Sequence, residues 1–224
     1  MNPVLHSSAS AHWRTPAYFL ELVRQVGPIA YDPASQPRNP TVARVFSFET
    51  PKGVRFTAED PPGQAERGAG GLDQDWEDVA EGGLVYCNPP YGSHLPGPVN
   101  PKAKIFRKVN GEPVLVGIGT GWAAKMAQNV GEGLYLVPAR VETGWFRRLH
   151  RWADWRLDWS SPTLGARIRF EDGSGARSGA PFPSSVFYRG PNVGRFMAAF
   201  KDHGTLVPGA RTLDVLLRAG LRGV

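Results

Sequence analysis

The feature that most constrains this chain is a short apolar run, Leu84-Val85-Tyr86-Cys87, that stops abruptly at Asn88-Pro89-Pro90-Tyr91-Gly92. Four consecutive apolar residues of β-favouring types predict a buried strand. The two prolines have a fixed φ angle and no N–H donor, so they predict a rigid loop at the end of that strand. Open α/β sheets bind ligands at the carboxyl ends of their strands. This loop is therefore the first candidate for a functional site.

Helical and extended patterns alternate along the rest of the chain. We expect helices near residues 15–27, 121–130, 145–152, 192–203 and 211–219, and strands near residues 29–31, 42–48, 54–56, 104–109, 112–118, 134–138, 166–171 and 185–189. Thr15 is interpreted as the cap of the first helix and Pro16 as its first helical residue. The alternation predicts a Rossmann-like α/β fold, with a mainly parallel sheet and a terminal antiparallel hairpin made by the last two strands. The length of 224 residues suits one domain, residues 1–224.

Basic residues are distributed unevenly. The net formal charge is +6, and residues 139–224 hold 14 Lys and Arg against 7 Asp and Glu. Residues 99–121 look inserted and contain two extended runs joined by Asn110-Gly111, which predicts a basic hairpin. Clustered basic side chains displace counterions from phosphates, so we expect DNA as a partner, with an ordinary solvated surface as the alternative. The candidate phosphate contacts are Lys102, Lys104, Arg107, Lys108 and Arg140, the last of which could equally form a surface ion pair.

The loop after the buried strand has a composition that suits one kind of chemistry. Its prolines leave carbonyl oxygens and the Asn88 amide as the polar groups, so hydrogen-bond acceptors predominate. An amino group on an aromatic base is a poor nucleophile because its lone pair is delocalised into the ring. If its hydrogens point at the Asn88 side-chain oxygen and the Pro89 carbonyl, the nitrogen can present its lone pair to an electrophile. Tyr91 offers a ring for stacking a flipped base, which contributes about 1–3 kcal/mol per base in single-strand binders.

These residues resemble those of the Asn/Asp-Pro-Pro-Tyr amino-methyltransferases that use S-adenosylmethionine, in particular the small phage and prophage DNA N6-adenine methyltransferases of the Dam-like group. The likeness extends over most of residues 13–190, in the pieces Trp13-Arg-Thr15-Pro16-Ala-Tyr-Phe19, Tyr31-Asp32-Pro33-Ala34-Ser35, Phe56-Thr57-Ala-Glu59-Asp60, Gly71-Leu72-Asp73-Gln-Asp75-Trp76, Val85-Tyr-Cys-Asn88-Pro-Pro-Tyr91-Gly92, Leu136-Val-Pro-Ala-Arg140 with Trp145-Phe146, and Ser178-Gly-Ala-Pro181-Phe-Pro-Ser184.

The resemblance implies a class I methyltransferase fold, S-adenosylmethionine as cofactor, and methyl transfer to the N6 amino group of adenine in DNA. By this likeness the catalytic loop consists of Asn88, Pro89, Pro90 and Tyr91. The same likeness implies that the cofactor lies near Thr15, Pro16, Asp32, Pro33, Ala34, Asn88 and one of Asp73 or Asp75.

The sequence departs from the family pattern at the cofactor loop. Relatives often carry a Gly-rich loop after the first strand, whereas this chain has Asp32-Pro33-Ala34-Ser35-Gln36. A Gly-x-Gly pattern occurs at residues 117–121, but the strand that follows ends in Val137-Pro138-Ala139, without the acid that would hold a ribose. We interpret residues 117–121 as the exit of the basic hairpin. Two alternatives stay open: an amino-methyltransferase acting on cytosine N4, an RNA base or protein glutamine, and a DNA-binding relative that no longer methylates.

Composition excludes several classes of protein. Cys87 is the only cysteine, so an internal disulfide and a Cys-rich zinc site are excluded, and the five scattered histidines lead us to expect no metal. The chain has no run of 18 apolar residues and a polar start, so we expect neither a membrane span nor secretion. The expected location is the cytoplasm of a bacterium or of a phage-infected cell. The sequence does not fix the oligomeric state, and a monomer is the simpler expectation.

Overall fold

The computed structural model describes residues 14–35, 41–48, 54–57, 71–72, 74–91, 104–109, 112–118, 121–171 and 177–220. The helices are α1 (Ala17–Val26), α2 (Trp76–Ala80), α3 (Trp122–Gln128), α4 (Gly144–Trp152), α5 (Val193–Phe200) and α6 (Ala210–Arg218). The strands are β1 (Ile29–Asp32), β2 (Val45–Phe48), β3 (Val54–Thr57), β4 (Leu84–Cys87), β5 (Lys104–Val109), β6 (Glu112–Ile118), β7 (Gly133–Pro138), β8 (Trp155–Trp159), β9 (Arg169–Glu171), β10 (Arg177–Gly179), β11 (Ser184–Arg189) and β12 (Gly204–Pro208).

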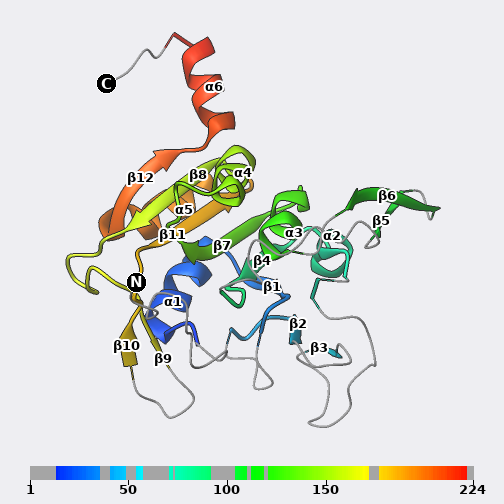
Figure 1. Ribbon diagram of the computed structural model, residues 1–224, viewed down its shortest axis with the longest axis horizontal. Coiled ribbons are helices and arrows are strands. Elements are labelled where there is room, and N and C mark those ends of the chain that lie inside the picture. Colours follow the sequence, from blue (N-terminus) through cyan, green and yellow to red (C-terminus); the bar gives the residue numbers. More distant parts are fainter. Residues whose placement is uncertain are drawn as a thin grey trace, which may run out of the picture.

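The largest sheet of the described residues has eight strands in the order β12-β8-β11-β7-β4-β1-β2-β3 (Figure 1). The four strands β7, β4, β1 and β2 run parallel, whereas β11 runs antiparallel to both β7 and β8, and the edge strands β12 and β3 are also antiparallel to their neighbours. The protein is therefore α/β, as predicted, but the expectation of a mainly parallel sheet is wrong because the sheet is mixed. Two of its antiparallel pairs involve β8 and one involves β12, and neither strand was predicted.

The predicted hairpin between the last two strands does not form. Residues 169–171 pair with residues 177–179 in a separate two-stranded ladder, while β11 lies between β7 and β8. Burial explains the difference. Five consecutive residues of β11 are buried, so this strand needs neighbours along both edges and helices over both faces. In β9 an exposed residue precedes a buried one, which suits a two-stranded ribbon with one covered face.

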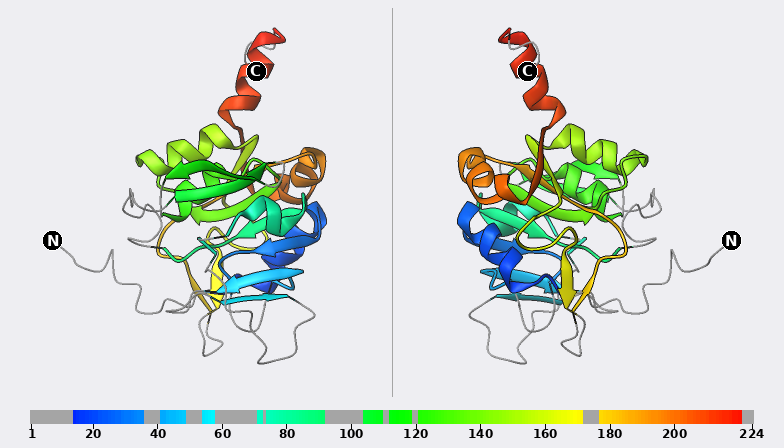
Figure 2. Two further views of the ribbon diagram at one scale, coloured as in Figure 1. Left: turned by 90° about the vertical axis from the view of Figure 1, so that its right-hand side faces the viewer. Right: turned by 90° about the vertical axis from the view of Figure 1, so that its left-hand side faces the viewer.

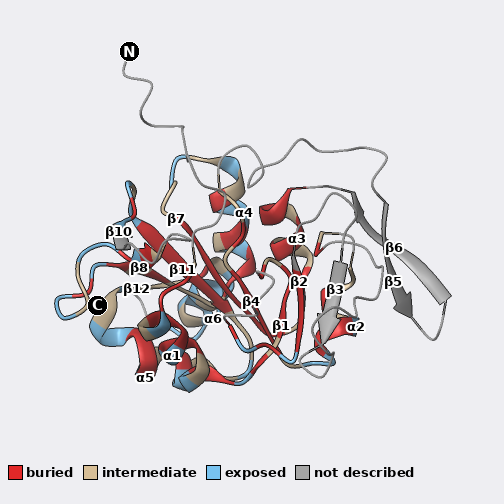
Figure 3. Cartoon of the chain, turned by 90° about the horizontal axis from the view of Figure 1, so that it is seen from below, coloured by how far each residue is buried: buried red, intermediate tan, exposed pale blue. Residues whose placement is uncertain are grey.

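Helices cover both faces of the sheet, as Figures 1 and 3 show. Helices α1 and α5 pack on one face, and α2, α3 and α4 pack on the other. The alternation of side chains along β4 serves both layers: Leu84 and Tyr86 belong to the core beneath α1 and α5, and Val85 and Cys87 belong to the core beneath α2, α3 and α4. Cys87 is fully buried, as its apolar neighbours predicted. The last helix, α6, projects beyond the sheet (Figure 2).

Helix α1 forms largely as its sequence predicts, but its start differs. The predicted apolar positions Phe19, Leu22, Val23 and Val26 are all buried, and the helix ends at the expected glycine. Pro16 occupies the capping position, and no side chain caps the helix. The prediction that Thr15 caps α1 is therefore wrong. Its hydroxyl group has a different partner, which lies 73 residues away in the sequence.

The predicted basic hairpin forms as a two-stranded antiparallel sheet of β5 and β6, paired from Lys104 with Ile118 to Val109 with Glu112. Only the backbone of these strands is described, so the candidate phosphate contacts of Lys104, Arg107 and Lys108 stay predictions. Lys102 lies outside the described residues.

Candidate functional site

The carboxyl ends of β1 and β4 bring the predicted site residues to one edge of the sheet. Strand β1 pairs with β2 on one side and with β4 on the other. The chain continues from β1 to β2 and β3 on one side and then crosses to β4 on the other side, so the strand order reverses at β1. Such a switch point opens a crevice at the strand ends, where open α/β sheets bind ligands. Asp32 is the last residue of β1, and Asn88 directly follows β4. The residue predicted to bind the target base, Asn88, and the residue predicted to bind the cofactor, Asp32, thus lie at the ends of neighbouring strands at the switch point.

The side-chain amide of Asn88 is held in one orientation by two neighbours. Its Nδ2 donates to the Thr15 Oγ1 atom at 3.0 Å, and its Oδ1 accepts from the Tyr91 hydroxyl at 2.6 Å. An amide oxygen has two lone pairs, so Oδ1 can accept one more hydrogen bond. The loop therefore presents the acceptor that the sequence predicted, with its direction already set.

Thr15 connects this amide to the core. Its Oγ1 atom lies 2.9 Å from the hydroxyl oxygen of Tyr86, which is buried. Burial raises the pKa of the Tyr86 phenol well above its usual value, so the hydroxyl keeps its proton. Thr15, predicted as a cofactor contact, is thus the residue that positions Asn88 in this structure. Pro16 caps α1 beside it, and Pro89 is buried, whereas Pro90 is half-buried.

The Tyr91 ring is held by aromatic side chains that sequence reasoning missed. It makes edge-to-face contacts with Phe182, at a centroid distance of 5.4 Å, and with Phe170, at 6.2 Å. Phe170 lies on β9, and Phe182 lies just before β11. The signal for Phe182 was its place in the piece Pro181-Phe-Pro-Ser184 of the family likeness. No local pattern pointed to Phe170, because the contact joins residues far apart in the sequence.

Asp32 is a buried carboxyl group with partners on both oxygens. Its side chain is 2% exposed; Oδ1 accepts from the Ala34 N–H at 3.1 Å, and Oδ2 accepts from the Thr41 hydroxyl at 2.8 Å. Burial raises the pKa of Asp32 from 3.8 to about 6, although these hydrogen bonds lower it. A buried acid with a raised pKa at a strand end is typical of functional sites. Thr41 was not among the predicted residues.

The predicted acidic segment meets the loop that follows β1. A Cβ atom on Gly71 would lie 1.9 Å from the Pro33 carbonyl oxygen, so these two backbones are in close contact. The Gly71 carbonyl also accepts from the Trp76 indole N–H at 2.6 Å, which ties this segment to α2. Asp73, one of the two predicted cofactor ligands, lies outside the described residues.

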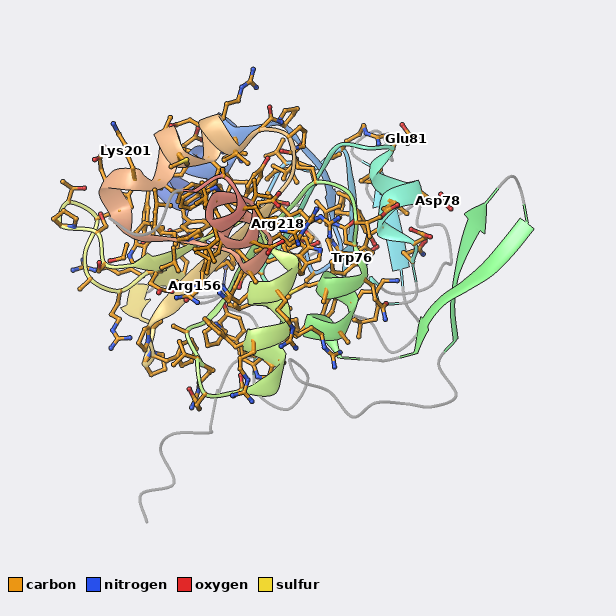
Figure 4. All side chains as sticks on the ribbon, turned by 90° about the horizontal axis from the view of Figure 1, so that it is seen from above. Trp76, Asp78, Glu81, Arg156, Lys201 and Arg218 are labelled. Carbon is orange, nitrogen blue, oxygen red and sulfur yellow. The ribbon has the colours of Figure 1, made fainter. Side chains whose placement is uncertain are left out.

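Asp75, the other predicted cofactor ligand, caps helix α2. Its Oδ1 accepts from the backbone N–H groups of Glu77 at 3.0 Å and Asp78 at 3.4 Å. Figure 4 shows α2 with Trp76 turned toward the sheet and Asp78 and Glu81 turned outward. The structure gives Asp75 a structural role that the sequence analysis did not predict.

Two further predictions concern the edges of the site. Arg140 follows the carboxyl end of β7, and its Nη1 lies 3.8 Å from Glu142 Oε1, with both side chains exposed. This is the surface ion pair that the sequence left open, and a DNA contact stays a prediction. Of the Gly-x-Gly region at 117–121, the first two residues end β6 and Gly121 caps α3, while residues 119–120 lie outside the described residues. Strand β6 belongs to the separate hairpin rather than to the main sheet. Interpretation of this region as the hairpin exit is consistent with that arrangement.

Comparison of this chain with protein-family models, curated proteins and solved structures gave no match. Within the described residues there is no group of three or more His, Cys, Asp or Glu side chains that could hold a metal ion. None of the helices in the described ranges is long and apolar enough to cross a bilayer.

We predict that Gly71→Ala destabilises the protein by about 1–3 kcal/mol, because the new methyl group would collide with the Pro33 carbonyl and the backbone would have to shift. The measurement is the free energy of unfolding in urea. Gly27→Ala is the matched control: no atom lies within 4 Å of its Cβ position, and its backbone is extended. Equal stabilities of the two variants would contradict the close contact.

We predict that Asp32 makes the protein less stable as the pH rises. Its folded pKa of about 6 exceeds the unfolded value of 3.8, so its contribution is fully present below about pH 4 and is lost as the pH rises through 6. Wild type should lose about 3 kcal/mol relative to Asp32→Asn across this range. Urea unfolding at several pH values measures the difference. Asp78→Asn, at an exposed position of α2, is the control, and parallel curves for wild type and Asp32→Asn would refute the prediction.

Proposed function

We propose that this protein is an S-adenosylmethionine-dependent methyltransferase that methylates the N6 amino group of adenine in DNA. The observation that carries the proposal is the Asn88 amide, fixed by Thr15 and Tyr91 at the sheet's switch point, where β1 ends in the buried Asp32. An oriented acceptor after a buried strand and a buried acid after its neighbour are what base binding and cofactor binding at one crevice require.

The sheet supports a class I methyltransferase fold. The four parallel strands β7, β4, β1 and β2 carry the candidate site at their carboxyl ends, and the antiparallel strands β11 and β8 lie beside them. This antiparallel pair is the nearest counterpart in this chain of the terminal hairpin that the strand pattern predicted. It differs from the expected hairpin in using β8, rather than β9, as the partner of β11.

The residues at the end of β1 fit the cofactor. Bound S-adenosylmethionine supplies an electrophilic methyl group on a positively charged sulfur. The Asp32 carboxylate would accept hydrogen bonds from the amine or the ribose hydroxyls of the cofactor, and ligand donors would offset the cost of burying this charge. Pro33, Ala34 and Asp73 remain candidates for further contacts, whereas Asp75 is engaged with α2.

The residues after β4 would prepare the target amine. Asn88 Oδ1 would accept one of its hydrogens beside the existing bond from Tyr91, and the Pro89 carbonyl would accept the other. These acceptors would concentrate the lone pair on nitrogen, which could then take the methyl group that a bound donor supplies, with the donor's sulfur keeping the electron pair of its bond to carbon. The nitrogen would release its extra proton to solvent afterwards. Positioning and fixed dipoles supply the acceleration.

The decisive experiment is incubation of the protein with duplex DNA and S-adenosylmethionine labelled in its methyl group, followed by nucleoside analysis. We predict N6-methyladenine, and no label with Asn88→Ala. Label in N4-methylcytosine, in RNA or in protein would instead identify one of the other amino-methyltransferases. Binding of the cofactor without transfer to any of these substrates would identify a relative that no longer methylates.

We predict that Thr15→Val and Tyr91→Phe each lower kcat by about 10- to 100-fold, because each removes one hydrogen bond that orients the Asn88 amide. Cofactor affinity, measured by calorimetry, should stay within a few-fold of wild type. Thr212→Val is the matched control, since Thr212 lies on α6, away from the site, and its hydroxyl donates to the backbone carbonyl of Asp154. Loss of cofactor affinity in Thr15→Val with an unchanged kcat would mean that Thr15 contacts the cofactor rather than Asn88.

A further inference from the structure

Four arginine side chains, from two helices and from the end of one strand, line one pocket away from the site. The pocket has a volume of about 480 Å³ and is lined by Arg148 and Arg151 of α4, Arg189 at the end of β11 and Arg211 of α6. Trp152 and residues of α3 complete its wall. Figure 4 looks onto this end of the molecule, with α6 toward the viewer and α4 and α3 beside it.

The acidic side chains near this pocket do not balance its charge. Among the described residues, Arg148, Arg151 and Arg189 form no ion pair, and the Arg211 Nη1 lies 3.9 Å from Asp154 Oδ1. That distance is at the limit of an ion pair. Asp154 also accepts from the Gly190 N–H at 3.1 Å, so its charge is shared. The pocket therefore holds an excess of positive charge.

The neighbouring carboxylates are committed elsewhere. Glu132 accepts from the Tyr188 hydroxyl at 2.7 Å and from Asn192, and Glu77 accepts from the backbone N–H groups of residues 130 and 131. Both acids thus bind local backbone and side-chain groups, and Glu77, like Asp154, offsets only part of the positive charge around Arg189. Since arginine stays protonated at every physiological pH, the positive charge of the pocket is permanent.

The Arg189 side chain is held in place by an aromatic ring. Its guanidinium group lies over the Trp152 ring at 5.9 Å, which restricts its orientation. Burial, together with the repulsion from Arg211, lowers the pKa of Arg189 below its usual value. A bound anion would relieve this repulsion. The arrangement is a half-buried, stacked cation beside exposed ones, which suits recognition of a group with several acceptor oxygens.

We propose that this pocket binds phosphate groups through Arg148, Arg151, Arg189 and Arg211. Guanidinium groups match phosphate oxygens with paired hydrogen bonds, and the volume is that of a small-molecule site. Two sources supply the same chemistry: a small phosphate ester, such as a nucleotide, and the backbone of a nucleic acid.

The pocket is separate from the candidate active site. Arg189 pairs with Gly133 at the amino end of β7, whereas Asn88 follows the carboxyl end of β4, which runs parallel to β7. The two sites therefore lie at opposite ends of the parallel strands. The phosphate site does not depend on the proposed methyltransferase activity, and its test needs no turnover.

The test is calorimetric titration of the protein with sodium triphosphate and, separately, with a short DNA duplex. We expect one triphosphate per chain and an affinity at least ten-fold weaker in the double variant Arg148→Gln and Arg151→Gln. Both side chains are exposed and unpaired among the described residues, so the variant should fold, and its thermal unfolding is recorded as a check. The control is the double variant Arg195→Gln and Arg218→Gln, which removes the same charge at two exposed positions outside the pocket. It should leave triphosphate affinity within two-fold of wild type.

The two probes distinguish the sources. A loss of triphosphate affinity in the pocket variant supports a small phosphate ester as the ligand, and a loss of DNA affinity alone supports backbone phosphates. Equal losses of affinity in the pocket variant and the charge-matched control would mean that net charge alone accounts for the binding, and would overturn the proposal. It would also be overturned if wild type bound neither probe at millimolar concentration.

Discussion

Strand β4 lies between β1 and β7 with all four of its side chains buried, two under each layer of helices. A strand in that position needs hydrogen-bonding neighbours on both edges and apolar cover on both faces, which only a layered α/β arrangement supplies. Asn88 directly follows the strand, and the two rigid prolines come next. The Asn88 side chain therefore lies at a defined point of the sheet edge. The position of the candidate site follows from this one buried strand.

Local rules predicted the elements whose signals lie within a few residues. The buried strand 84–87, the apolar face of α1 and the hairpin of β5 and β6 all depend on short-range spacing, and the structure contains each of them. The Asn110-Gly111 turn predicted between the two hairpin strands lies outside the described residues. Strand β8 also alternates apolar and polar residues, from Trp155 to Trp159, but its two tryptophans follow a helix with similar residues. Because of that similarity the sequence analysis did not predict strand β8, and it therefore did not predict that the sheet is mixed.

Sequence reasoning predicted the candidate site residues but not the partners of their side chains. Thr15 was assigned to the site on family likeness and to a helix cap on local pattern, and its observed contacts are with Tyr86 and Asn88, more than 70 residues away. Asp75 illustrates the reverse case, because a local capping bond with α2 occupies a residue assigned to a distant ligand. The arginine pocket was visible in the sequence only as an excess of charge in the last third, since its side chains come from α4, β11 and α6. Tertiary contacts decide such roles, and no single-sequence pattern encodes them.

Strand β9 connects two parts of the candidate site that are distant in sequence. Glu171 exchanges backbone hydrogen bonds with Arg14, at 2.8 and 3.1 Å, directly before Thr15, and Phe170 packs against the Tyr91 ring. Both hydrogen bonds that orient the Asn88 amide therefore depend on elements that β9 holds, one through the chain entering α1 and one through the aromatic contact. A displacement of β9 would release the amide from both sides at once. The short β9-β10 ribbon is thus part of the support of the site.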